Sequence, residues 1–199
     1  MSRSWIEFWD RPNSVYVGER HLAAHFRVVA DELIGLFGGR PGLRVLDYGC
    51  GEALDAARVA GRAARLTLCD SSPNLRERLT ARFGGVANIA VVAPESLVDL
   101  PDASFDLVFA SSVVQYLDAA TLDAILATFR RLLAPDGTLV FADVIPADNR
   151  LVDDLRALLV FAWRNGFAMR ALASLVATLF SDYRRLRARH GLAAYDDAT

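Results

Sequence analysis

The sequence predicts an α/β fold in which a doubly wound parallel sheet carries helices on both faces. Five short, continuously apolar segments alternate with segments of helical periodicity, a pattern typical of parallel strands buried on both sides. The chain has 199 residues, of which 53% are hydrophobic. This is enough for one such domain with a sizeable core and a helical extension.

The first predicted helix covers residues 19–37, because apolar side chains recur there at helical spacing and a glycine-rich segment follows. Five strands are then predicted, at residues 43–49, 66–70, 88–93, 105–111 and 138–145. Helices are predicted between them at residues 52–62, 73–83 and 118–134, the last ending at a Pro135-Asp136-Gly137 turn. No further strand is predicted after Pro146, where the chain is predicted to be helical to about residue 190.

Composition excludes several classes of chemistry. All 22 basic residues are arginine. Without lysine the chain cannot form the Schiff bases of pyridoxal-phosphate enzymes and lysine-dependent aldolases, or build the Gly-Lys-Ser/Thr phosphate loop. The formal charge of -2 gives no net attraction to nucleic acid. The three histidines do not cluster with acids in the sequence, so we predict no metal site.

Neither end of the chain nor its cysteines point to export or to a membrane. Cys50 and Cys69 each end a predicted strand and lack the spacing of a zinc or redox site. The N-terminal residues lack the apolar core of a signal peptide, and arginines interrupt the apolar run at residues 155–180. We therefore expect a cytoplasmic protein without a transmembrane segment.

The most informative segment is the glycine turn after the first strand. Gly49 and Gly51 follow Asp47 there and allow a tight turn that a ligand can approach closely. Asp70 ends the next strand, where an acid can accept hydrogen bonds from ribose hydroxyls. A dinucleotide site favours glycine or alanine at position 54, so Leu54 counts against NAD or FAD.

Four segments in order resemble the class I S-adenosylmethionine-dependent methyltransferases of the small-molecule type. They are VLDYGCGEA, LCDSSPN, LPDASFDLVFASSVVQYL and FRRLLAPDGTLVFADVI, and they lie within residues 40–145. The resemblance implies S-adenosylmethionine as cofactor and S-adenosylhomocysteine as product. It also implies that Asp47, Gly49 and Gly51 face the methionine part of the cofactor and that Asp70 binds both ribose hydroxyls.

The resemblance implies further cofactor contacts. Ser71 is expected beside the adenine. The acid that the family often uses for the adenine amine falls in register on Pro94, which passes that role to Glu95 or the backbone of Ser96. Ser111 and its neighbour Ser112 are expected near the transferable methyl group. For Tyr16 two roles stay open, since it either binds the cofactor carboxylate or packs as an aromatic.

The catalytic residues are harder to assign. Some family members carry a histidine shortly after the fourth strand, where this chain has Gln115 and Tyr116, which either orient a substrate or pack. Asp143 on the fifth strand is the best-placed carboxylate for a general base, with a structural role as the alternative. His21 and His25 flank the apolar stripe of the first helix, and we interpret them as surface histidines.

The resulting hypothesis is in-line methyl transfer to oxygen, nitrogen or carbon of a small-molecule acceptor, within a domain at residues 1–146. The alternative is a non-catalytic methyltransferase-like domain that acts in partner binding or regulation. Residues 147–199 are interpreted as a helical lid or substrate wall, against core packing or a surface contact. The family usually adds two more strands, so we expect an open sheet edge covered by another chain or by further residues, and an oligomer formed there or through the C-terminal helices.

Overall fold

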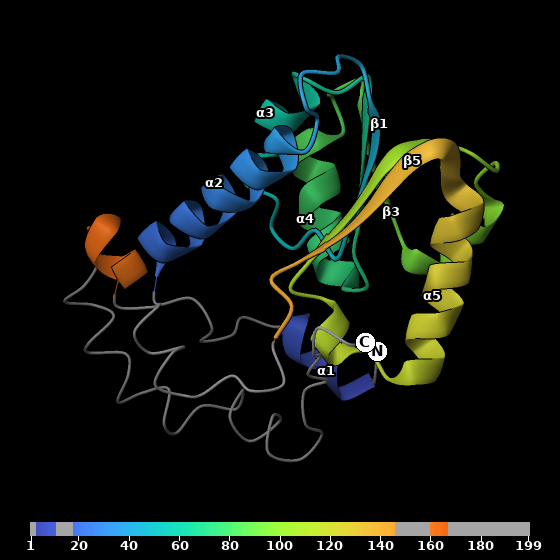
Figure 1. The fold of residues 1–199 in the computed structure, drawn as a ribbon. Coiled ribbons are helices and arrows are strands. Elements are labelled where there is room, and N and C mark those ends of the chain that lie inside the picture. The colour runs from blue at the N-terminus through green and yellow to red at the C-terminus, as the bar shows by residue number, and fades with distance from the viewer. Residues whose placement is uncertain (1–2, 11–17, 146–159, 167–199) are drawn as a thin grey trace.

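The computed structural model describes residues 3–10, 18–145 and 160–166. A parallel sheet of five strands lies at the centre of this part of the chain, with helices on both faces (Figure 1). The strands are β1 (Arg44–Tyr48), β2 (Arg65–Cys69), β3 (Ile89–Val92), β4 (Phe105–Ser111) and β5 (Leu133–Ala142). The helices are α1 (Arg3–Trp9), α2 (Glu19–Gly35), α3 (Ala56–Ala60), α4 (Pro73–Phe83) and α5 (Ala119–Leu132), with short 3₁₀ helices η1 (Pro94–Asp99) and η2 (Val114–Tyr116).

The strand order is β3-β2-β1-β4-β5, and every neighbouring pair is parallel. The chain thus winds outward from β1 in one direction and then outward from β4 in the other. This order confirms the predicted doubly wound class and its five strands. β3 and β5 are the outer strands of the described sheet.

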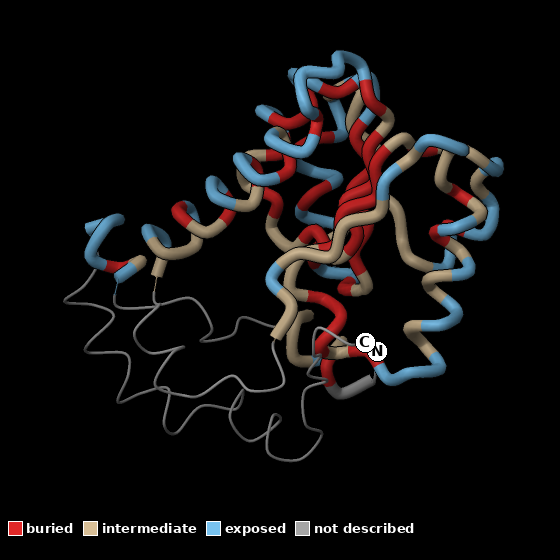
Figure 2. The backbone as a smooth tube through the Cα atoms, viewed as in Figure 1, coloured by how far each residue is buried: buried red, intermediate tan, exposed pale blue. Residues whose placement is uncertain are grey.

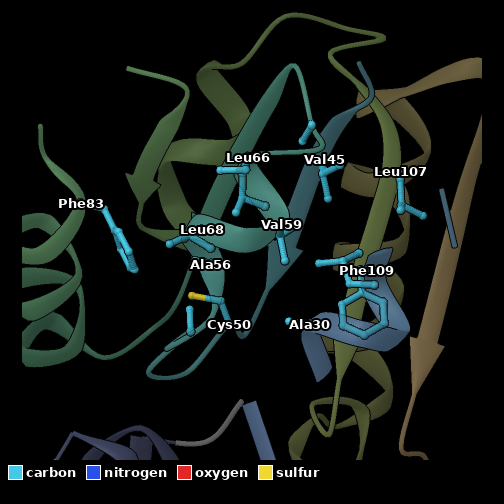
Figure 3. Packing of buried hydrophobic residues seen from close by; sticks show 14 of the residues in the cluster. Ala30, Val45, Cys50, Ala56, Val59, Leu66, Leu68, Phe83, Leu107 and Phe109 are labelled. Carbon is cyan, nitrogen blue, oxygen red and sulfur yellow. The ribbon is translucent and has the colours of Figure 1, made fainter. Parts of the chain in front are cut away.

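Alternate residues of each central strand enter two separate cores. Leu107 and Phe109 of β4 pack with α2, α3 and α4 on one face, as Figure 3 shows for part of this cluster. Val108 and Ala110 pack on the other face, where Phe129 and Leu132 of α5 cover the sheet. Figure 2 shows the buried residues concentrated along the sheet and on the helix surfaces that cover it. Burial on both faces explains why the strand sequences are continuously apolar.

Local signals set the starts of two helices. Ser72 caps α4 by accepting a hydrogen bond from the Leu75 N–H at 3.1 Å. Asp118 caps α5 in the same way, with the Thr121 N–H 2.8 Å from its Oδ1. The predicted helix at residues 52–62 is shorter in the structure, because Ala53 has a φ of 41° and only residues after Asp55 are helical.

The prediction for the fifth strand was wrong at both ends. β5 begins at Leu133, and the Pro135-Asp136-Gly137 segment lies inside it rather than in a turn. Pairing shifts from Phe105 with Leu133 to Leu107 with Thr138, which makes an irregularity in an outer strand. Proline and glycine are tolerated at such a place because an outer strand has fewer backbone hydrogen bonds to lose. The strand ends at Ala142 because Asp143 adopts a φ of 51°.

The structure adds elements that the sequence did not predict, namely α1, η1 and η2. Of the predicted helical segment 147–199, only residues 160–166 are described. Their Ala162 is fully buried against Ala24 of α2. The remainder of that segment lies outside the described residues, so the division at residue 146 stays a prediction. In the described ranges, no helix combines the length and the apolar character that crossing a membrane requires.

Candidate functional site

The strand order places a candidate site at the carboxyl ends of β1 and β4. These strands are neighbours, yet the connections that follow them lead to opposite sides of the sheet. Parallel α/β sheets bind ligands in the crevice at such a topological switch point. The segments that meet there are the glycine turn after β1 and the loop that runs from Ser111 into η2.

The glycine turn has a shape that only glycine accepts. Gly49 and Gly51 have φ angles of 72° and 57°, in the left-handed region. A Cβ atom at position 49 would lie 2.3 Å from Cγ2 of Val113, and one at position 51 would lie 3.0 Å from Cζ of Phe26. The turn is also tied to β2, since the Gly49 N–H donates to the Cys69 carbonyl at 2.7 Å. The predicted turn is therefore rigid and closely packed against α2 and the loop after β4.

Asp70 connects the end of β2 to this turn. Its Oδ2 accepts a hydrogen bond from the Gly51 N–H at 3.1 Å, and its Oδ1 accepts one from the Ser72 N–H at 2.9 Å. The side chain is buried, which raises its pKa, and the two N–H donors and the charge of Arg76 oppose that rise. The structure thus brings two sequence-predicted residues, Asp70 and Gly51, into direct contact.

Asp47 is the second buried carboxyl of the site. Burial, together with the charge of Asp70, raises the pKa of Asp47 to about 7. No arginine of the described ranges forms an ion pair with either aspartate. Two buried acids of like charge at one turn fit a ligand that brings positive charge and hydrogen-bond donors.

The residues predicted to lie beside an adenine follow β2 and β3. Ser71 is half-buried and directly follows Asp70, whereas Glu95 and Ser96 are exposed at the start of η1. The charge of Glu95 contributes to raising the pKa of Tyr48 and of Cys69, after burial as the main cause. Glu95 therefore lies on the same edge of the sheet as the ends of β1 and β2.

The other side of the site lies at the ends of β4 and β5. Ser111 ends β4 and is half-buried. Ser112 and Asp143 both have left-handed backbones, with φ angles of 57° and 51°, and the Ser112 hydroxyl donates to Oδ2 of Asp143. Gln115 in η2 is 5% exposed, and its Oε1 has no hydrogen-bond partner in the described structure. The structure thus places Asp143 in contact with Ser112. Three residues after Ser112, the buried amide oxygen of Gln115 has no partner among the described residues.

Helix α1 lies at the carboxyl ends of the strands, and the sequence did not predict it (Figure 1). Trp5 is 2% exposed, and its ring centroid lies 4.7 Å from that of Tyr116. At the end of the helix, Asp10 Oδ1 accepts hydrogen bonds from the Ser72 hydroxyl at 2.5 Å and from the Asn74 N–H at 3.0 Å. Helix α1 therefore contacts both the acidic side and the Tyr116 side of the site.

A sequence signal for α1 did exist, because an Asp-Arg-Pro segment follows a short aromatic run, but seven residues are too few for a periodicity.

Tyr16 lies outside the described residues, so its two proposed roles stay open. In the described ranges, no group of three or more histidine, cysteine or acidic side chains is arranged to hold a metal ion. Both cysteines are buried and unpaired.

Comparison with known proteins shows which family this chain resembles. The family model described as "Methyltransferase domain" matches residues 46–141. The malonyl-[acyl-carrier protein] O-methyltransferase of Serratia marcescens is 33% identical over 120 residues, which is 60% of this chain and 46% of that protein. The N-methyltransferase NodS of Bradyrhizobium japonicum, solved with S-adenosyl-L-homocysteine, is 26% identical with a TM-score of 0.50, covering 58% of this chain and 60% of NodS.

A third relative is named carboxy-S-adenosyl-L-methionine synthase, from Dichelobacter nodosus. It is 27% identical over 155 residues, which is 74% of this chain and 65% of that protein.

The doubly wound sheet, together with the glycine turn that is hydrogen-bonded to Asp70, defines a Rossmann-like domain of the kind that binds nucleotides. The family match over residues 46–141 and these relatives confirm the predicted resemblance to the class I S-adenosylmethionine-dependent methyltransferases. The chain spans about half the length of the first curated relatives that it matches.

Proposed function

We propose that this chain binds S-adenosylmethionine at the switch point and transfers its methyl group to a small molecule. One observation carries the proposal: the glycine turn is hydrogen-bonded to the buried Asp70, with the buried Asp47 at the same turn. Both acids lack an ion-pair partner in the described part of the chain, and the family match covers the same residues.

The residues present fit this cofactor. S-adenosylmethionine brings a positive sulfonium, an ammonium group and two ribose hydroxyls. A nearby cation favours the ionised form of Asp47, whose pKa burial has raised to about 7. Asp70 uses one lone pair of each oxygen for the N–H groups of Gly51 and Ser72. Its carboxylate has further lone pairs that can accept the ribose hydroxyls.

The remaining cofactor contacts are assigned by position. Ser71, Glu95 and Ser96 are proposed beside the adenine, and Ser111 is proposed near the methyl group. For Tyr16, which lies outside the described residues, binding of the cofactor carboxylate is the proposed role and packing as an aromatic is the alternative. Residues 147–199, which the sequence predicts to be helical, are proposed as a lid or substrate wall, and the burial of Ala162 against α2 supports this.

The cofactor supplies an electrophilic methyl carbon, and the protein supplies position and exclusion of water. Holding two reactants in line contributes roughly 7–11 kcal/mol of barrier lowering in favourable cases. Trp5 of α1 packs on the Tyr116 ring, and we propose that this contact keeps water out on that side. Gln115 and Tyr116 are proposed to orient the acceptor, and Asp143 is proposed to take its proton.

Calorimetric titration with S-adenosylmethionine and S-adenosylhomocysteine tests the proposal. We expect both to bind, and we expect Asp70→Asn to weaken binding about 10- to 100-fold, because hydrogen bonds to a charged acceptor are lost. Asp102→Asn is the matched control, since Asp102 is exposed in an ion pair with Arg131 far from the glycine turn. If the unmodified chain bound neither compound, the proposal would be wrong.

A second candidate is a domain that binds the cofactor without transferring its methyl group, in partner binding or regulation. The similarity to a carboxy-S-adenosyl-L-methionine synthase supports keeping this candidate. The name of that relative describes a reaction other than methyl transfer, so similarity to such proteins does not by itself imply methyl transfer. Incubation with methyl-labelled cofactor and a metabolite extract separates the two. Label in a small molecule supports methyl transfer, whereas binding without any labelled product supports the second candidate.

We also propose a reducing, cytoplasmic setting, which the two unpaired buried cysteines support. Association through the outer strand β5 or the predicted C-terminal helices is the corresponding proposal for assembly, because an outer strand has unpaired backbone groups.

A further inference from the structure

Two non-glycine residues in the left-handed conformation lie side by side at the ends of β4 and β5. They are Ser112 and Asp143. The Ser112 hydroxyl donates to Asp143 Oδ2, and the Ser112 N–H donates to the Ala142 carbonyl at 3.0 Å. Backbone conformations of this kind are costly for residues with a Cβ, and they persist where surrounding contacts enforce them, often at functional sites. The pair therefore holds the Asp143 carboxylate at a fixed place.

Asp143 lies near α2, the helix whose Phe26 packs against the glycine turn. Burial raises the pKa of Glu32 and the charge of Asp143 raises it further, while burial lowers the pKa of His25 and Asp143 opposes that change. Both residues belong to α2, so Asp143 lies within electrostatic range of this helix. Phe26, the neighbour of His25, contacts Gly51. The end of β5 and the glycine turn therefore lie next to the same segment of α2.

Gln115 adds a second group at this edge. Its amide oxygen is buried without a hydrogen-bond partner in the described part of the chain, although the residue is only 5% exposed. A buried acceptor without a donor is destabilising, so such an atom points to a ligand that supplies one. Gln115 lies between Val113, which packs against Gly49, and Tyr116, which packs against Trp5. Gln115 therefore belongs to a short segment whose residues on either side contact the glycine turn and α1.

We propose that Gln115 and Asp143 select a methyl acceptor that carries a hydrogen-bond donor, namely an amine or a hydroxyl, over one that presents an ionised carboxylate. The inference rests on the proposed methyl transfer and deepens it. Both groups offer oxygen lone pairs. A carboxylate would place its own lone pairs and negative charge against them, whereas an N–H or O–H donor satisfies them.

The proposed step is a direct transfer of the methyl group from sulfur to the acceptor. The lone pair of the acceptor nitrogen or oxygen forms a bond to the methyl carbon as the carbon–sulfur bond breaks. Sulfur keeps that electron pair and loses its positive charge, which leaves S-adenosylhomocysteine. The acceptor gives its proton to the Asp143 carboxylate, and Asp143 is exposed, so the proton passes on to solvent.

The test uses small probes that share a carbon skeleton and differ in one group: benzylamine, benzyl alcohol and benzoate, with hexylamine, hexanol and hexanoate as a second set. Binding of each probe is measured by ligand-observed NMR on the protein saturated with S-adenosylhomocysteine. We expect the amine and the alcohol of each set to bind at least tenfold more tightly than the carboxylate. Tighter or equal binding of the carboxylates, or binding of no probe, would overturn the inference.

Two variants assign the selectivity to residues. Gln115→Leu removes the amide oxygen at similar size, and we expect it to weaken amine and alcohol binding at least threefold with an unchanged or higher melting temperature. Asp143→Asn keeps an acceptor for the Ser112 hydroxyl but removes the charge, and we expect the amine-to-carboxylate ratio of affinities to fall at least tenfold. A merely structural role would leave that ratio unchanged, which would contradict the assignment.

The titration with S-adenosylhomocysteine comes first and separates the two levels. If this compound does not bind, the proposed function fails and the inference fails with it. If it binds and the probes show no preference for donors, only the inference fails.

Discussion

The two halves of the site differ in how their polar groups are satisfied. At the ends of β1 and β2, Asp70 receives two backbone N–H groups, and the glycine turn is bound to β2. At the ends of β4 and β5, two residues have left-handed backbones and a buried amide oxygen lacks a donor. The first half has its hydrogen bonds in place before any ligand arrives. The second half has one unmet acceptor among the described residues, which agrees with its proposed role in binding the methyl acceptor.

The largest expected effect comes from breaking the junction between the halves at Gly49. Gly49→Ala combines a left-handed φ of 72° with a Cβ only 2.3 Å from Val113, whose branched side chain is stiff. Together these cost about 2–5 kcal/mol of unfolding free energy. We expect loss of S-adenosylhomocysteine binding as well. Urea unfolding and calorimetry measure the two effects.

Two further variants separate the contributions at this junction. Gly85→Ala is the control, since nothing lies within 4 Å of a Cβ at that position, and we expect little change in stability from it. The double variant Gly49→Ala/Val113→Ala relieves the clash and leaves the backbone strain, so we expect it to recover part of the loss. No recovery would show that the Val113 contact is unimportant.

The next effect concerns charge in the half of the site at the ends of β1 and β2, which we call the acidic half because it contains Asp47 and Asp70. The pKa of Asp47 is about 7 in the folded state against an ordinary value of 3.8, because burial and the charge of Asp70 raise it. Ionisation is thus disfavoured on folding, and the unliganded protein loses stability as the pH rises from about 4 to about 7. At pH 8 we expect Asp47→Asn to be more stable than the unmodified chain by on the order of 3 kcal/mol. We also expect it to bind S-adenosylmethionine more weakly.

Thermal unfolding between pH 5 and pH 8 measures the stability effect, with Asp102→Asn as the exposed control. If the pH dependence of Asp47→Asn matched that of the unmodified chain, the assignment of the buried charge to Asp47 would be wrong.

The smallest effect concerns α1, which touches both halves. Asp10 accepts hydrogen bonds from Ser72 and Asn74 at the start of α4. We expect Asp10→Ala to cost about 1 kcal/mol, as loss of a helix cap does. The Ser72 hydrogen bond holds the pKa of Asp10 below its usual value, so its contribution is present above about pH 4 and is lost at lower pH.

Melting temperatures at pH 7 and pH 3 check this prediction, with Glu7→Ala on the exposed side of α1 as the control. We expect the difference between Asp10→Ala and the unmodified chain to shrink at pH 3. A difference that is equal at both pH values would point to packing rather than to the charge of Asp10.

The sequence allowed the acidic half to be predicted far better than the other half. Gly49, Gly51 and Asp70 could be found because each occupies a fixed place after an apolar strand, and their roles depend on local backbone geometry. The link between Asp10 and Ser72 joins residues 62 positions apart and has no local signal. The unmet oxygen of Gln115 depends on what buries it, which no periodicity reports.

The errors in the strand and helix boundaries have a similar cause. Pro135 and Gly137 are strong turn signals in the sequence, yet they lie inside an outer strand that tolerates them. The left-handed backbone of Ala53 shortens α3, although alanine favours helices by itself. Tertiary context overrode local preference in both cases.

The contact between Val113 and Gly49 has a consequence for how such a domain changes over time. A methyl group of Val113 occupies the space that any side chain at position 49 would need. The loop that is proposed to bind the cofactor thus packs directly against the loop that is proposed to bind the acceptor. Because position 49 accepts only glycine, a substitution at position 113 is expected to be tolerated only where the new side chain still fits beside that glycine.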